Sequence, residues 1–366
     1  MGTPGVGGMA NMSVTPLTFE MAQRAGLILP AVRPTAAPLL TLRVGVADAA
    51  LVMVGDRVEP GQPLLERSME VVLVEVAARG GLESLAPGAK VDAALLPAAA
   101  GMGRHHPRSD DRVRMLFVDA DGVARLAVGR SPQVLLSPVW GIVETAAAGH
   151  LTIRAEGIGL AAAVGWGEPV HGRLLMGVAS PDAELRASSI DIGAAGSILV
   201  AGARLDIEAL TRARAIGVAG VICGGVVGRE LRQLAESDTR QRASLHTTSP
   251  FAVLTLDGYG RRPLPQLAWD LLSSAAGREV GLLPEAHIAV VSGDAAADMP
   301  PPRARDEVRI TAGDGAGRVG RLVGLAGPVR RPGGGYQVAG YVDDPAAPDG
   351  QPRRRVVPLA DLERLG

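Results

Sequence analysis

Residues 54–65 of this 366-residue chain read Val54-Gly55-Asp56-Arg57-Val58-Glu59-Pro60-Gly61-Gln62-Pro63-Leu64-Leu65. The stretch predicts a strand that enters, turns at Gly55-Asp56 and leaves toward Leu65, because Gly and Asp favour tight turns. Three neighbouring stretches are short, rich in branched apolar residues and bounded by turn residues, which is typical of strands. They cover residues 39–44, 50–54 and 71–76.

This pattern resembles the glycine-turn hairpin of lipoyl and biotinyl carrier domains, in which a methionine and then the modified lysine follow the hairpin. Here Met69 is followed by Glu70, and a carboxylate cannot form the amide that holds biotin or lipoate. The only lysine of the chain, Lys90, lies well downstream. The resemblance therefore implies a barrel-sandwich hybrid scaffold that has lost its carrier chemistry. We expect no cofactor, and neither biotin nor lipoate attachment.

A second β-rich block covers about residues 112–180. Its stretch Ser137-Pro138-Val139-Trp140-Gly141-Ile142-Val143 resembles the opening of a lipoyl-type half-barrel, and residues 164–175 echo the first hairpin. Each block supplies roughly half of the strands that such a sandwich needs. The blocks are either two modules or the halves of one split module, and we favour the split form. The expected barrel-sandwich region is 36–180, after a loose lead-in at 1–35.

From 188 to 293 the apolar period changes to strands alternating with helices. Asp206 is placed to cap a helix over 207–216, and Gly217 is placed to stop it. Buried strands between helices predict a three-layer, parallel, Rossmann-like α/β domain. Strands are expected at 197–202, 218–223, 251–256 and 288–291, and further helices near 229–236 and 266–276.

Within this domain, Gly202-Ala203-Arg204 and Ile222-Cys223-Gly224-Gly225 give a weak likeness to the DRTGG regulatory domain. Ala203 stands where that family has an aspartate, so the likeness implies the fold and no activity.

Ligands of open parallel sheets bind beyond the carboxyl ends of the strands. In this chain a helix start at Gly224-Gly225 is a candidate anion site, arginines are candidates to neutralise the anion, and a tyrosine is a candidate to stack on a base. The alternative is that the glycines only permit tight turns and the arginines are solvated. The candidate ligand-binding residues are Arg204, Gly224, Gly225, Asp257, Tyr259, Arg261 and Arg262.

A Pro/Ala/Asp-containing linker at 294–305 leads to a last β region, 306–366. Residues 308–323 run as a strand, a Gly-rich turn and a second strand, which resembles the KOW motif of ribosomal proteins and transcription elongation factors. The resemblance implies a C-terminal SH3-like small barrel. Arg309, Arg318 and Arg321 are candidates to contact nucleic acid or a protein partner. We favour a protein partner because few aromatic residues accompany the arginines and acidic residues dilute their charge.

The composition excludes several classes of function. A net charge of −1 gives no field that attracts nucleic acid or a membrane, and the single cysteine, Cys223, cannot form an internal disulfide. Neither a membrane-spanning apolar run nor a signal peptide is evident, so we expect a cytoplasmic protein with no membrane partner. We also expect no metal site, because His105-His106 and Asp110-Asp111 lie in a loop-like stretch without zinc-ligand spacing.

No nucleophile elbow, P-loop or Cys-x-x-Cys pair is present, so catalysis is not favoured. The sequence predicts a non-catalytic adaptor or accessory subunit that docks on a larger assembly. Two alternatives stay open: a nucleic-acid-associated factor that binds RNA through the KOW-like barrel, and a sensor of a small phosphorylated ligand or nucleotide through the α/β domain.

Overall fold

The computed structural model describes residues 34–92, 96, 111–147, 149–245, 249–294, 304, 306–331, 334–345 and 353–365. The chain divides into two compact units, one formed by residues 32–301 and one that contains residues 302–366. Most of the expected lead-in at 1–35 and of the linker at 294–305 lies outside the described residues, as do His105, His106 and Asp110. The prediction of a multidomain, β-rich fold with an α/β part is confirmed.

Two four-stranded sheets form the first part of the larger unit, and the two sequence blocks share both of them. β2 pairs with β9, β4 with β8 and β5 with β7, so in each of these pairs a strand before residue 78 meets one after residue 122. The strand expected at 50–54 is restricted to its first residue, since residues 51–55 form bends and turns. The sheet orders are β2 (Leu39–Arg43), β9 (His150–Ala155), β8 (Gly141–Ala147), β4 (Arg57–Val58), and β3 (Ala49–Ala50), β5 (Pro63–Ala77), β7 (Val123–Leu136), β6 (Arg112–Val118).

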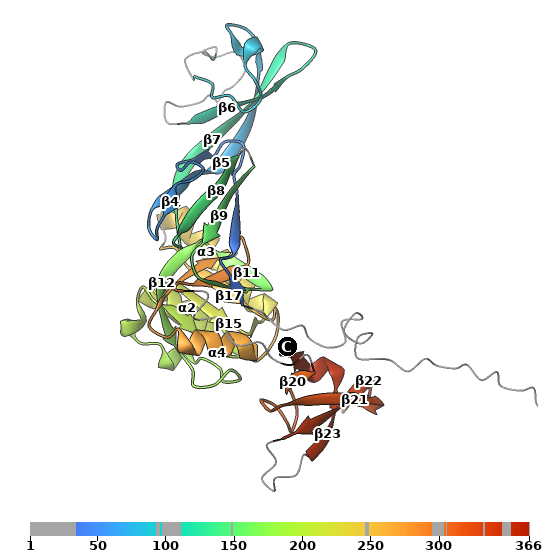
Figure 1. Ribbon diagram of the computed structural model, residues 1–366. Coiled ribbons are helices and arrows are strands. Elements are labelled where there is room, and N and C mark those ends of the chain that lie inside the picture. Colours follow the sequence, from blue (N-terminus) through green and yellow to red (C-terminus); the bar gives the residue numbers. More distant parts are fainter. Residues whose placement is uncertain are drawn as a thin grey trace, which may run out of the picture. The chain divides into compact units, whose positions relative to one another are not determined.

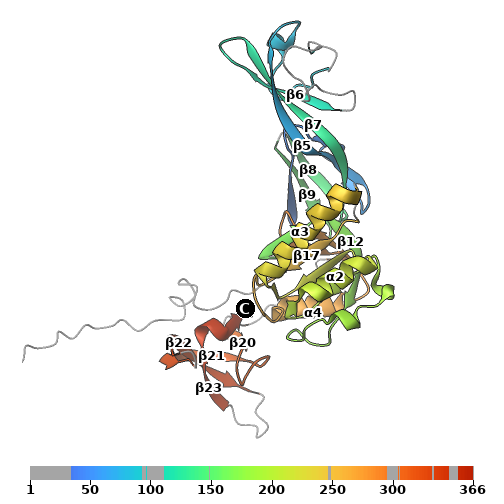
Figure 2. The same cartoon turned by 180° about the vertical axis from the view of Figure 1, so that it is seen from behind.

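The long strands β5 and β7 contribute side chains to two hydrophobic cores, which lie on opposite faces of their sheet. Leu65 and its partner Leu135 point into the core between the two sheets. Further along, Val74 and Leu126 point to the other face, where they join a second core. Side chains of neighbouring residues in a strand point to opposite faces of the sheet, so the same two strands can contribute to one core near one end and to the other core further along. Figures 1 and 2 show β5 and β7 running on past β8 and β9.

A nine-stranded mixed sheet completes the larger unit. Its members β10 and β11 follow each other in the chain, yet β10 pairs with β19 and β11 with β17 at the opposite side. Ala162 N–H bonds to His287 and Ala163 N–H to Thr255, so this segment closes the sheet on itself. The order is β1 (Thr35–Ala36), β10 (Ile158–Ala161), β19 (Ile288–Val291), β18 (Glu279–Leu283), β12 (Val170–Met176), β13 (Ile198–Val200), β15 (Gly220–Cys223), β17 (Ala252–Thr255), β11 (Val164–Gly167).

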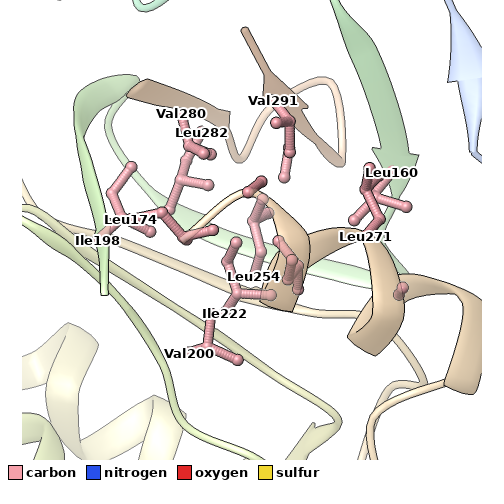
Figure 3. Close-up of a cluster of buried hydrophobic side chains, with 14 of the residues drawn as sticks. Leu160, Leu174, Ile198, Val200, Ile222, Leu254, Leu271, Val280, Leu282 and Val291 are labelled. Carbon is pink, nitrogen blue, oxygen red and sulfur yellow. The ribbon is translucent and has the colours of Figure 1, made fainter. Parts of the chain in front are cut away.

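The parallel strands β12, β13, β15 and β17 lie between helices, as predicted. Helices α2 (Ile207–Ile216) and α3 (Gly228–Leu245) cover one face with the cluster around Val221 and Cys223. Helix α4 (Gln266–Ser274) lies on the other face, where its Leu271 joins Ile222 and Leu254 in the cluster drawn in Figure 3. The Asp206 side chain caps α2 and Gly217 ends it with a φ of 88°, as the sequence predicts.

The hairpin β18–β19 holds the sandwich and the mixed sheet together. Leu282 and Val291 point into the closed sheet, whereas Leu283 and Val290 point into the sandwich core. The turn between the strands adds polar contacts, because Glu285 accepts the Arg43 N–H at 3.0 Å and an Arg67 guanidinium N–H at 3.0 Å. Short 3-10 turns elsewhere are Leu82–Ser84, Ala187–Ser189 and Ile192–Ala194.

The C-terminal unit is a five-stranded antiparallel sheet around the cluster of Val308, Leu322, Val342 and Leu362. The Gly-rich stretch between its first two strands turns at Gly313, with a φ of 83° that suits glycine. The sheet order is β23 (Arg353–Pro358), β22 (Tyr336–Asp344), β21 (Val319–Arg330), β20 (Glu307–Ile310), β24 (Leu362–Arg364), and a 3-10 turn at Leu359–Asp361 precedes β24.

Candidate functional site

The carboxyl ends of β13, β15 and β17 meet at one edge, and the segments that follow them lie together. The short strands β14 (Arg204–Leu205) and β16 (Gly225–Val226) pair in parallel there, and Val226 forms a bridge with Tyr259. The Arg262 N–H also bonds to the carbonyl of Ala203 at 3.0 Å. The seven candidate ligand residues of the α/β region therefore come from three segments that pack side by side.

The glycines at this edge have a packing role that the sequence analysis did not assign. A Cβ on Gly224 would lie 1.8 Å from the carbonyl oxygen of Arg262, and one on Gly225 would lie 2.4 Å from that of Gly260. The Gly224 N–H donates to the carbonyl of Gly202 at 2.7 Å. The pair is thus required for the close approach of the loop after β17, and the Gly224 amide is already bonded within the protein.

Each arginine at this edge faces a carboxylate. Arg204 pairs with Glu230 of α3 at 3.0 Å, and the Glu230 side chain is only 6% exposed. The other two pairs join Arg261 to Glu184 at 2.5 Å and Arg262 to Asp257 at 3.9 Å. Glu184 and Glu230 were missed by the sequence reasoning, since nothing local to either residue marks it as the partner of a distant arginine.

A shallow hollow of about 460 Å³ lies beside this edge, where α3 begins. Tyr259 is 59% exposed, and its ring lies over Gly228, 3.6 Å from where a Cβ would stand. Trp166 forms another wall and packs edge-on against Phe251, with ring centroids 6.5 Å apart. Leu231, Arg232 and Ala235 complete the lining. Aromatic walls beside one arginine are suited to a flat ligand that carries negative charge.

The three candidate arginines of the C-terminal unit are also paired. Arg309 is 1% exposed and bonds Glu363 at 2.9 Å, so a ligand on the surface does not reach it. Arg318 contacts Asp344 at 2.8 Å and Arg321 contacts Asp306 at 2.9 Å. Three further pairs in the same unit are Arg331–Asp361, Arg354–Asp343 and Arg355–Asp344.

The outer face of strands β21, β22 and β23 carries apolar side chains between these ion pairs. Tyr341 is the cross-strand partner of Val356 and lies opposite Gly324, next to Val323. The side chains of Tyr341, Val356 and Val323 are all exposed, that of Val356 by 51% and that of Val323 by 49%. The Arg354 guanidinium lies 5.8 Å from the centre of the Tyr341 ring. We call this surface, Val323, Tyr341, Val356 and Arg354, the outer face of the C-terminal sheet.

The pair that borders this face changes the titration of both members. The hydrogen bond from Arg354 is the main cause that lowers the pKa of Asp343; desolvation opposes it, and the charge of Arg354 adds a smaller lowering. The same hydrogen bond and charge raise the pKa of Arg354. Both side chains therefore stay ionised over the physiological range, and the border of the outer face is a neutral pair of charges.

Cys223 is buried in the core under α2 and α3, and burial raises the pKa of its thiol from 9.0 to about 12. Such a thiol is a poor nucleophile. Among the described residues, no group of three or more His, Cys, Asp or Glu side chains is placed to hold a metal ion. Within the same part of the chain, no helix combines the length and apolar character needed to cross a bilayer.

Comparison of the chain with protein-family models, with curated proteins and with solved structures found no match in any of the three.

Proposed function

We propose that this protein is a non-catalytic adaptor or accessory subunit that docks on a larger assembly, and that the outer face of the C-terminal sheet contacts its protein partner. The observation that carries the proposal is the exposed row of Val323, Tyr341 and Val356. Aromatic and aliphatic side chains in contact with arginine are enriched in protein–protein interfaces.

The ionic pairing of this unit favours a protein partner over nucleic acid. Affinity for a phosphate backbone comes mainly from lysine and arginine charge that releases counterions. Here Arg318, Arg321 and Arg354 each lie within 3.0 Å of a carboxylate, which a phosphate would have to displace. An interface rim of balanced charges adds specificity for a protein surface with less dependence on salt.

The finer resemblances belong to this proposal. We infer a split barrel-sandwich module in residues 36–180, since strands of both sequence blocks pair within the same sheets. Glu70 stands in the interior of β5, opposite Arg130, and its carboxylate forms no amide with biotin or lipoate. We infer a KOW-like or SH3-like barrel in residues 306–366, supported by the five-stranded antiparallel sheet and its Gly-rich turn.

Affinity capture with the full-length protein tests the docking face. Replacement Tyr341→Ala should remove the captured protein, and Tyr336→Ala should not, because Tyr336 is 71% exposed at the start of the same strand but lies outside the outer face. Equal capture by the two variants, or loss in both, would contradict the proposal. Titration with a short RNA at two salt concentrations is the companion measurement. Tight binding that weakens steeply with salt would favour the nucleic-acid-associated factor instead.

A second candidate function, sensing of a small phosphorylated ligand or nucleotide, is favoured by the hollow between Trp166 and Tyr259. A ligand that binds there stabilises the folded protein in proportion to its concentration over Kd. Thermal unfolding with nucleotides and inorganic phosphate would then show a shift of several degrees, which Tyr259→Ala should abolish. Absence of any shift across the ligands would exclude this function and leave the adaptor.

A further inference from the structure

Strand β5 has an edge that is open over half of its length. On one side, β7 pairs with it from Leu65 to Ala77. On the other side, β3 pairs only with Leu65 and Glu66, and the Ser68 N–H then donates to the Asp48 carboxylate at 2.8 Å. Among the described residues, no strand, bridge or backbone hydrogen bond occupies that side of β5 over residues 70–76.

The backbone groups that point to this open edge can be assigned from their neighbours. The Ala78 N–H donates to the carbonyl of Gly122, in register with the pair Ala77–Val123, so in this half of β5 the even-numbered residues direct their N–H and C=O toward β7. On the far side of β7, the Met115 N–H and C=O bond to Ala89 and Gly88, and the Asp119 N–H donates to Val123, which leaves the even-numbered residues of β7 facing β5. Within residues 70–76, the residues that direct their backbone groups to the open edge are therefore Val71, Leu73 and Glu75.

We propose that this edge binds the same edge of a second copy of the chain, with the two β5 strands antiparallel about a two-fold axis at Leu73. An open strand edge is a template for another strand, and a two-fold axis satisfies both edges at once. Ser68 and β3 limit the open stretch at one end, and the end of β5 at Ala77 limits it at the other. Leu73 is the midpoint of what remains.

Pairing about this midpoint uses every open backbone group. Leu73 of one copy lies opposite Leu73 of the other, and Val71 lies opposite Glu75 on both sides of the axis. Each such pair exchanges two hydrogen bonds, which makes about six across the axis. A two-fold axis at any other residue leaves part of the open stretch unpaired.

The side chains fit the same register. Leu73, 71% exposed in one copy, meets Leu73 of the other, and Val71 lies beside Glu75. Glu75 is already neutralised by Arg125 at 3.2 Å, and no glutamate faces a glutamate. An axis at Glu70 would instead place two glutamates opposite each other, which destabilises a sheet. On the other face, Val72 and Val74 join the two copies of the second core.

Mass measurement and disulfide trapping of the full chain test the proposal. Leu73 meets itself in a hydrogen-bonded pair, where Cα atoms lie about 5.5 Å apart, a separation that a disulfide spans. Leu73→Cys should therefore form a covalent dimer under mild oxidation. Met53→Cys is the matched control, because Met53 is 72% exposed but lies in a loop off the edge, and the native Cys223 is buried.

Light scattering should find a dimer for the native protein and for Met53→Arg. Leu73→Arg should be monomeric, because it places two guanidinium groups at the axis, and Val71→Pro should raise the dimer dissociation constant at least tenfold through loss of an edge N–H. Unchanged circular dichroism would show that both variants fold. A monomer at all concentrations overturns the proposal. A dimer in which Leu73→Cys is trapped no faster than Met53→Cys also overturns it, since another surface would then join the copies.

Discussion

Arg309 and Glu363 form a buried ion pair that joins the first and the last strand of the C-terminal sheet. The Arg309 Nε lies 2.9 Å from a Glu363 carboxylate oxygen, and their side chains are 1% and 5% exposed. The two residues are direct cross-strand partners on β20 and β24. The pair therefore links Glu307–Ile310 to Leu362–Arg364, which are far apart in the chain.

Removing one member of this pair should destabilise the C-terminal unit. Arg309→Met removes the guanidinium that faces the buried Glu363 carboxylate, and the free energy of unfolding should fall by about 3–5 kcal/mol. Hydrogen exchange of β20 and β24 in urea measures the change. Tryptophan fluorescence is an internal control, because Trp140, Trp166 and Trp269 all lie in the larger unit. The double variant Arg309→Met, Glu363→Leu should recover most of the loss, and a double variant no more stable than the single one would contradict this account.

Alanine should destabilise the larger unit at Gly224 and should not destabilise it at Gly228. Gly224→Ala forces a methyl group against the Arg262 carbonyl, 1.8 Å from the Cβ position, and should destabilise the larger unit by about 1–3 kcal/mol. Gly228→Ala meets only ordinary contact at 3.6 Å, at the start of α3, and should be neutral or stabilising by up to about 1 kcal/mol. Urea unfolding followed by tryptophan fluorescence measures both. Equal effects of the two substitutions would show that the close approach of the loop after β17 is not what requires Gly224.

The features that the sequence predicted well are those whose signals are local. The ends of α2 follow from Asp206 and Gly217, and the strand–helix alternation follows from short apolar runs between turn residues. The arginine pairs were not predictable, because Arg309 meets Glu363 and Arg261 meets Glu184 only after distant strands have paired. The same limit applies to the closure of the mixed sheet, which depends on pairing between β11 and β17.

The candidate ligand residues show the same difference between features with a local sequence signal and contacts between distant segments. A rule about parallel strand ends correctly gathered Arg204, Gly224 and Tyr259 at one edge. It did not show that the Gly224 amide is bonded to Gly202 or that Arg204 faces Glu230, because both contacts depend on segments packed against the edge.

The pKa of Asp343 should report the contact with Arg354 on the outer face. Because the hydrogen bond from Arg354 lowers it, Arg354→Met should move this pKa up toward its ordinary value, as measured by NMR titration of the carboxyl carbon. Arg353→Met is the matched control, since Arg353 is the cross-strand partner of Asp344. A group with a lowered folded-state pKa stabilises the fold above its unfolded-state pKa, and this contribution is lost as the pH falls through the folded-state value. An Asp343 titration that is the same in native protein and Arg354→Met would contradict the pairing.

Cys223 should be unreactive until the mixed sheet opens. Its thiol is buried beneath α2 and α3, and a pKa near 12 leaves almost no thiolate at neutral pH. Since the folded-state pKa lies above the ordinary 9.0, the contribution of Cys223 to stability should be constant below pH 9 and should be lost as the pH rises from about 9 toward 12. Labelling by a thiol reagent in increasing urea should follow the tryptophan transition, and Cys223→Ala removes both the label and this alkaline loss. Because the chain has a single cysteine, fast labelling of the native protein would show directly that the α2–α3 layer opens without global unfolding.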